Sequence, residues 1–217
     1  MTRHLLILLL WILSAQAGEG DRLLSQVRKQ FEARGLWEIQ FTQELISPMD
    51  HDTNRSAGRL LACPGGAFRV DLEGLHLLSD GQNLWRWETG GSQVLLERPG
   101  QSPDVLLPHQ LLILLEERFR VTALKAEGPR RKRLQLAPKT SSEYMREIVL
   151  VLAQEGGQWW PADMAFSDFS DTRFRFLVKS RRSWPDRSPR KGELTFRQPA
   201  GMELIDLRAP GAAHATP

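Results

Sequence analysis

The side chains that could do chemistry are few and far apart in the chain. Asp50, His51 and Asp52 stand together in the stretch SPMDHDTNRS, where two carboxylates and an imidazole could bind a metal ion weakly. We expect a solvated loop instead, because the stretch is polar throughout. Asp168 and Asp171 could form an acid and base pair, but their place beside a Ser-Asp turn is more typical of turn chemistry.

The sequence also lacks the short motifs of common enzyme classes. It has no glycine-rich phosphate loop with a lysine, no His-Glu-x-x-His, no Gly-x-Ser-x-Gly and no Cys-x-x-Cys. The remaining histidines of the chain's body and tail, His76, His109 and His214, have no metal-ligand spacing. We therefore expect no metal, no cofactor and no catalysis, and an enzyme acting on lipid or glycan is disfavoured because no nucleophile is paired with a base.

The first residues are typical of a signal peptide. Arg3 and His4 precede an apolar run that ends near Leu13, and Ala15-Gln16-Ala17 forms a small-x-small cleavage site. The run is too short to span a bilayer, so we predict cleavage after Ala17 and export to the periplasm of a double-membraned bacterium. An uncleaved interfacial helix is the alternative.

Charge and cysteine content restrict the possible partners. Removal of the predicted signal peptide lowers Lys and Arg from 29 to 28 against 26 Asp and Glu, a balance too mild to indicate nucleic-acid binding. Cys63 is the single cysteine and cannot form an internal disulfide. Basic residues gather late in the chain, which predicts polar outer strand faces or, alternatively, contact with anionic lipid or an acidic partner; they are Arg130, Arg131, Lys132, Arg133, Arg173, Arg175, Lys179, Arg181 and Arg182.

The elements that must position any site are mostly strands. An amphipathic helix is predicted over Asp21–Leu36, and Trp37, Ile39 and Phe41 then alternate with polar residues as in a half-buried strand. Asp80-Gly81 predicts a hairpin turn within Leu75–Glu88, whose second arm carries Trp85 and Trp87 on one face. Further strands are predicted at Arg59–Cys63, Phe68–Leu72, Gln93–Arg98, Phe119–Ala126, Lys132–Ala137, Tyr144–Gln154, Gln158–Phe169, Thr172–Lys179 and Gly192–Arg197.

Ten or eleven strands with short links favour a curled antiparallel meander of barrel type. The segment Ser102–Phe119 is helical in length but apolar on nearly every side, so it must be covered on both sides. It is either buried under a loop or placed over a cavity that holds an apolar ligand. The last ten residues, 208–217, are small, polar and proline-rich and are expected to be disordered.

Motifs in a fixed order now resemble the periplasmic outer-membrane lipoprotein carriers, the LolA-like proteins. The terminal and SDG-x-x-LW pieces are the most specific, and together the motifs cover nearly all of the mature chain. They are FTQ at Phe41–Gln43, G-x-L at Gly58–Leu60, Pro64 followed by Phe68, LLSDGQNLW at Leu77–Trp85, the leucine-rich stretch Leu106–Leu115, LAPK at Leu136–Lys139 and LTFRQPAGMELID at Leu194–Asp206.

The resemblance implies a mainly β fold with some helix: an unclosed antiparallel β-barrel of about 11 strands, whose concave apolar side is lidded by helices. It implies one carrier domain over residues 18–207, a monomer that takes lipid-modified proteins from an inner-membrane export complex to an outer-membrane acceptor. Residues expected to line the acyl-chain cavity are Phe41, Leu60, Phe68, Leu77, Leu84, Trp85, Leu106, Leu111, Leu114 and Leu115.

One position departs from the family pattern. The family has an arginine beside the proline of the Pro-Phe piece, where it is thought to latch the lid, whereas Cys63 precedes Pro64 here. A thiol is a weak hydrogen-bond donor, so we expect a more open or more mobile lid unless Arg59 or Arg69 latches it. Two other functions stay open: a carrier or sensor of free lipid in the cell envelope on the same fold, and a structural envelope protein with a filled core.

Overall fold

The computed structural model describes residues 18–33, 35–49, 52–99, 115–140, 145–190 and 192–208. Residues 18–32 and 115–118 are helical. The strands are β1 (Leu36–Ile46), β2 (Thr53–Ala62), β3 (Ala67–Leu72), β4 (Leu75–Asp80), β5 (Leu84–Glu88), β6 (Gln93–Glu97), β7 (Phe119–Ala126), β8 (Arg131–Pro138), β9 (Arg146–Glu155), β10 (Gln158–Ser167), β11 (Arg173–Trp184) and β12 (Glu203–Asp206).

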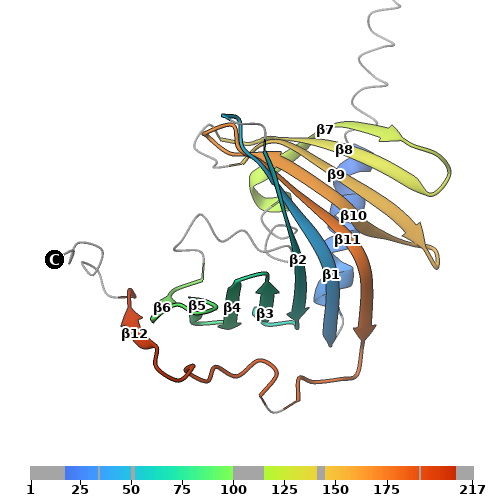
Figure 1. Cartoon of the computed structure of the whole chain (residues 1–217). Coiled ribbons are helices and arrows are strands. Elements are labelled where there is room, and N and C mark those ends of the chain that lie inside the picture. The colour runs from blue at the N-terminus through green and yellow to red at the C-terminus, as the bar shows by residue number, and fades with distance from the viewer. Residues whose placement is uncertain are drawn as a thin grey trace, which may run out of the picture. The chain divides into compact units, whose positions relative to one another are not determined.

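These strands hydrogen-bond in a single order, β12-β6-β5-β4-β3-β2-β1-β11-β10-β9-β8-β7 (Figure 1). Neighbours in sequence pair antiparallel from β2 to β6 and from β7 to β11, whereas β12 pairs parallel with β6. β12 and β7 stand at the two ends of the order, so among the described strands the sheet is unclosed. The predicted fold class is confirmed.

Most element boundaries agree with the sequence pattern to within a few residues, and two differ in kind. The helix predicted over Asp21–Leu36 ends at residue 32, because Leu36 and Trp37 already belong to β1. The strand predicted at Gly192–Arg197 is wrong. Gly192 has a φ of 95° and Glu193 N donates to Arg190 O over 3.0 Å, which is a turn, and the last strand is β12.

Several predictions concern residues outside the described ranges. They are the signal peptide and its cleavage at Ala17, the pair Asp50-His51, most of the apolar segment Ser102–Phe119, and the tail beyond Arg208. The alternative interpretations of these segments therefore stay open.

The chain divides into two compact units. Unit 1 comprises Met1–Gln30, Thr42–Arg55 and Pro108–Val178, and unit 2 comprises Phe31–Phe41, Ser56–Leu107 and Lys179–Pro217. Each unit has its own apolar core.

Unit 1 is built from the helix and an apolar sheet face. Leu24 and Val27 of the helix are buried, and Gly20 lies so close to Val121 that an added Cβ would be 2.5 Å from its Cγ1. Asp21 Oδ1 accepts a hydrogen bond from Val121 N over 3.3 Å, which fixes the helix start on β7. Figure 1 shows the blue helix behind β8 to β10. The buried side chains of those strands include Leu134, Leu136, Ile148, Leu150 and Met164.

Unit 2 contains the hairpin that the Asp80-Gly81 pair predicted. Asp80 Oδ1 accepts hydrogen bonds from Gln82 N over 2.9 Å and from Asn83 N over 2.7 Å, and Gly81 has a φ of 95°. A side chain at Gly81 would also meet Gly65 O at 2.5 Å, so two turns of the unit approach closely where only glycine fits. This turn sets the register of β4 against β5.

Candidate functional site

Strand register divides the unit 2 side chains between two faces of its sheet. Residues directly opposite each other in an antiparallel pair point to the same face. The Phe68 face carries Leu60, Ala62, Phe68, Val70, Leu77, Ser79, Leu84, Arg86 and Glu97. The Trp85 face carries Arg59, Leu61, Arg69, Asp71, His76, Leu78, Trp85, Trp87, Val94 and Leu96.

The Phe68 face brings five of the predicted cavity residues together. Leu60 and Phe68 are fully buried, and Leu77 and Leu84 are 4% and 3% exposed. Phe41 joins them from β1, because its ring fills the space that a Gly58 side chain would take, with Cζ only 2.4 Å from the position of an added Cβ. The result is a mostly apolar wall across β1 to β5, in which Ser79 lies between Phe68 and Leu84.

Trp85 does not belong to that wall. It pairs with Leu78, which pairs in turn with Arg69, so its ring points to the opposite face from Phe68 and Leu84. The prediction that Trp85 lines one wall with Phe68 is therefore corrected. Leu84 and Trp85 are neighbours in β5, and neighbouring residues of a strand point to opposite faces.

The Trp85 face is closed by the chain's own C-terminal segment. The Trp85 and Phe196 rings stack with centroids 4.8 Å apart, and Trp87 meets Phe196 edge-on at 6.0 Å. His76 stacks on Trp87 at 5.2 Å. The two tryptophans are therefore half of an aromatic cluster that the end of the chain completes.

Charged side chains of the Trp85 face bind one another. Arg69 Nε and Nη2 donate three hydrogen bonds to the Asp71 carboxylate, between 2.9 and 3.1 Å, and His76 Nδ1 lies 2.9 Å from Asp71 Oδ1. Burial alone would raise the pKa of Asp71, but the hydrogen bonds and charges of Arg69 and His76 outweigh it and lower the pKa below its ordinary value. Arg59 Nε donates to Glu38 Oε1 over 2.9 Å. Arg59 and Arg69 are thus engaged on this face.

The Phe68 face also holds a polar pair that the sequence pattern did not reveal. Arg86 lies opposite Leu77, and Glu97 lies opposite Leu84, so both point to the apolar wall. Their one contact runs from Arg86 Nη2 to Glu97 Oε1 over 3.3 Å, and Glu97 is 3% exposed. Counting residues outward from the Asp80-Gly81 turn would have placed Arg86 on the Phe68 face. The prediction from the sequence considered only the neighbouring tryptophans, which lie on the other face.

The remaining predicted residues are spread over other parts of the chain. Leu106, Leu111 and Leu114 lie outside the described residues. Leu115 is fully buried in unit 1. Cys63 follows β2, where its thiol donates to Ala67 O over 3.6 Å, and partial burial raises its pKa.

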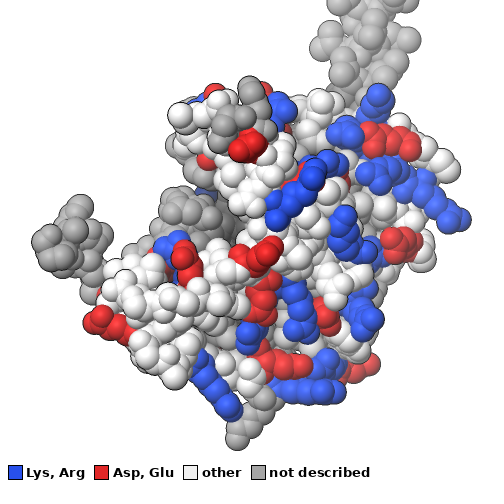
Figure 2. Space-filling model, in the orientation of Figure 1, with Lys and Arg blue, Asp and Glu red and all other residues white. Residues whose placement is uncertain are grey.

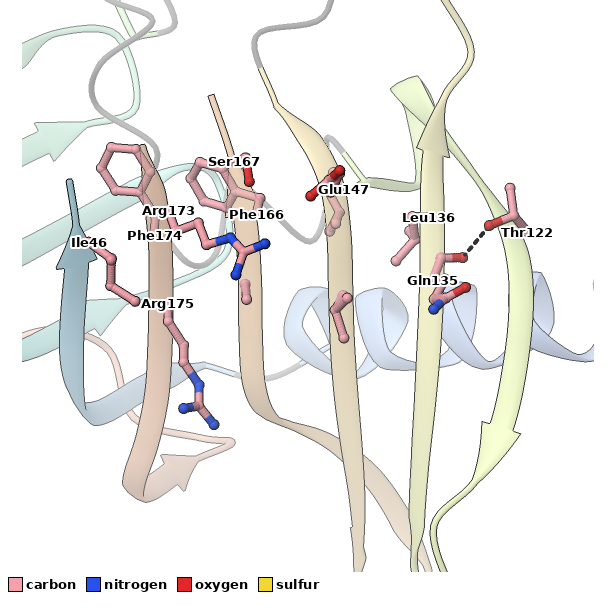
Figure 3. Close-up of a pocket in the computed structure, with 13 residues that line it drawn as sticks. Ile46, Thr122, Gln135, Leu136, Glu147, Phe166, Ser167, Arg173, Phe174 and Arg175 are labelled. Carbon is pink, nitrogen blue, oxygen red and sulfur yellow. Dashed lines mark hydrogen bonds between the residues drawn. The ribbon is translucent and has the colours of Figure 1, made fainter. Parts of the chain in front are cut away.

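A separate hollow of about 630 Å³ lies in unit 1 (Figure 3), and none of the predicted cavity residues lines it. Phe166 and Phe174 contribute stacked rings with centroids 5.0 Å apart, and Arg173 and Arg175 contribute guanidinium groups. Arg175 is bound by Asp163 through three hydrogen bonds between 2.7 and 3.2 Å. Within the described ranges, no group of three or more His, Cys, Asp or Glu side chains could hold a metal ion.

Four of the nine late basic residues, Arg131, Lys132, Arg133 and Arg175, pair with acids. Lys132 Nζ lies 2.6 Å from Glu19 Oε1, and Arg131 and Arg133 both pair with Glu127. Figure 2 shows red and blue side chains mixed over the visible face. This supports the interpretation of polar outer strand faces over a single basic patch.

Comparison with known proteins identifies a family and a similar fold. The family model described as outer membrane lipoprotein carrier protein LolA matches residues 36–188. An uncharacterized conserved protein from Thermus thermophilus is similar in structure, with 13% identity and a TM-score of 0.54 over 87% of this chain and 99% of that chain. A LolA superfamily protein from Nitrosomonas europaea gives 12% identity and a TM-score of 0.48 over 81% of this chain and 96% of that chain.

No curated protein matches the chain in sequence. Within the part of the chain that the structure describes, no helix is both long enough and apolar enough to cross a membrane.

Proposed function

We propose that this chain carries lipid-modified proteins through the periplasm, with their acyl chains against the Phe68 face. The premise is that the chain belongs to the LolA family of outer membrane lipoprotein carrier proteins, whose family model matches residues 36–188. The observation that carries this proposal is the wall formed by Phe41, Leu60, Phe68, Leu77 and Leu84. It is mostly apolar and lies on the opposite face of the sheet from the one that Phe196 covers.

The free-energy cost of exposing acyl chains to water is large. Each acyl methylene moved into water costs roughly 0.8 kcal/mol, so a chain of about 16 carbons costs on the order of 12 kcal/mol. A protein with two or three such chains cannot cross water unaided at a useful rate. A carrier must hide this surface and later release it, which favours a dispersive apolar wall.

The family also implies the route. We propose that the cargo comes from an inner-membrane export complex and goes to an outer-membrane acceptor, and that the carrier works as a monomer. The sequence has no nucleotide-binding motif, so the energy for transfer would come from those partners.

Neighbouring residues of β4 offer a matched test. We would place p-benzoylphenylalanine at Leu77, on the Phe68 face, or at Leu78, on the Trp85 face; both positions are buried. After illumination with a synthetic diacylated lipopeptide, the Leu77 variant should cross-link to the acyl chain and the Leu78 variant should not. Far-ultraviolet circular dichroism checks that both variants fold.

Cross-linking tests the wall, and a second measurement identifies the cargo. Equal cross-linking from both positions, or none from Leu77 in a folded variant, would contradict the proposed wall. Mass spectrometry of lipid retained through purification addresses the alternative of a free-lipid carrier or sensor: acylated protein supports the lipoprotein carrier, and free phospholipid alone supports the alternative.

A further inference from the structure

The Arg86–Glu97 pair is unusual for its position on an apolar wall. Arg86 of β5 and Glu97 of β6 are diagonal neighbours on the Phe68 face, beside Leu77 and Leu84. The Glu97 side chain is removed from water and the Arg86 side chain is 27% exposed, and the cost of burying a carboxylate is recovered only when the geometry is good and its remaining acceptors are bound. A charged pair here calls for an explanation that packing does not supply.

The pair is also incomplete. Arg86 Nε and Glu97 Oε2 are both buried, and neither has a hydrogen-bond partner among the described residues. The one contact between the two side chains, 3.3 Å from Nη2 to Oε1, is long for charged groups. Buried donors and acceptors are nearly always hydrogen-bonded, so an unfilled donor and acceptor on the proposed acyl-binding wall indicate a polar partner from outside the chain, either water or a polar group of the ligand.

Elsewhere the same chain completes such a pair. In unit 1, Arg175 and the buried Asp163 share three hydrogen bonds of 2.7, 3.1 and 3.2 Å. This fork-to-carboxylate geometry satisfies both side chains. The open geometry of Arg86 and Glu97 is therefore a property of their site rather than of arginine and carboxylate pairs in this fold.

The unfilled atoms define the chemistry of the partner. Nε presents an N–H donor and Oε2 presents a charged acceptor, so the matching group needs an acceptor and a donor together. An amide has both, with its C=O facing Arg86 and its N–H facing Glu97. A phosphate has acceptors only and carries negative charge, which Glu97 would repel.

We propose that Arg86 and Glu97 bind the amide group at which the acyl chains of a lipid-modified peptide begin, so that the carrier prefers amide-bearing lipids to anionic phospholipids. This inference rests on the proposed acyl-binding function of the Phe68 face. The wall then holds the chains by burial, and the pair positions their polar end.

Two matched lipids test the pair directly. N-methylpalmitamide and methyl palmitate have the same chain and carbonyl, but only the amide has an N–H. Each is used to displace an environment-sensitive apolar dye from the protein. We expect the amide to bind about tenfold more tightly than the ester, since a hydrogen bond to a buried carboxylate is lost in the ester. Hexadecyl phosphate should bind more weakly than the amide.

Variants assign the preference to the pair. Arg86→Leu combined with Glu97→Leu should fold, because apolar residues often replace a buried ion pair without loss. It should bind both neutral lipids with equal affinity. If it does not fold, Glu97→Gln serves instead: its carboxamide can turn an N–H outward, and the ratio of amide to ester affinity should fall. The control is Arg59→Gln combined with Glu38→Gln, an ion pair that involves the Trp85 face, which should keep the preference.

The outcomes separate this inference from the proposed function. If neither neutral lipid displaces the dye from the folded protein, the acyl-binding function itself is wrong. If both bind equally and the double leucine variant does not change this, only the amide preference is wrong. Tightest binding of hexadecyl phosphate, lost in Arg86→Leu, would assign the pair to a phosphate headgroup and overturn the inference.

Discussion

The two faces of the unit 2 sheet differ in how they are completed. On the Trp85 face, Phe196 stacks on the tryptophan, and the Asp71 carboxylate receives hydrogen bonds from Arg69 and lies beside His76. On the Phe68 face, the side chains are apolar and the one charged pair has an unfilled donor and an unfilled acceptor among the described residues. The C-terminal segment and ion pairs therefore complete the Trp85 face, whereas the buried side chains of the Phe68 face form the wall that we propose contacts acyl chains.

The largest expected effect comes from truncation within the closed face. Leu78→Ala should lower the free energy of unfolding by about 2–5 kcal/mol, because Leu78 is 1% exposed and its loss leaves a cavity. Its acyl affinity, measured by dye displacement on the folded protein, should not change.

The matched change on the other face is Leu77→Ala. It should weaken acyl binding by about tenfold through lost contact with the chain. Equal loss of acyl affinity in both variants would remove the distinction between the faces.

Gly58→Ala should have a smaller but more specific effect. The added Cβ would lie 2.4 Å from Phe41 Cζ, so the ring must move off the Phe68 face. Overpacking of this kind typically costs about 1–3 kcal/mol, and acyl affinity should fall with it. Urea unfolding and dye displacement measure the two effects. Gly18→Ala is the control, since an added Cβ there meets no atom within 4 Å. Unchanged acyl affinity in Gly58→Ala would place Phe41 outside the wall.

The smallest effect is a pH dependence of the closed face. The pKa of Asp71 is lowered in the folded protein, because the hydrogen bonds and charges of Arg69 and His76 outweigh the opposing effect of burial. Its carboxylate therefore stabilises the fold above its ordinary pKa of about 3.9, and this stabilisation is lost as the pH falls through the lowered value. The difference in urea unfolding between the wild type and Asp71→Asn should stay constant above about pH 4 and shrink as the pH falls from there through the lowered pKa of Asp71. A difference that persists in full below the lowered pKa would show that Asp71 acts by packing alone.

The sequence by itself determined the strands and the sheet class. A period of two in the apolar residues, with Asp80-Gly81 as a turn, predicted the hairpin of β4 and β5 and an antiparallel meander, and the family resemblance implied that the barrel is unclosed. The ordered motifs indicated the family, which the family model over residues 36–188 confirms. These properties are local, so a single sequence contains the information that decides them.

Only the tertiary structure decided which face the C-terminal segment covers. Periodicity tells which residues share a face, but both faces of this hairpin are apolar, so it could not distinguish Leu84 from Trp85 as wall. That choice depends on Phe196, far along the chain, which covers Trp85. The Arg86–Glu97 pair likewise needs the pairing of β5 with β6 to exist. The Trp85–Phe196 contact joins segments that are far apart in the chain, and no local pattern records it.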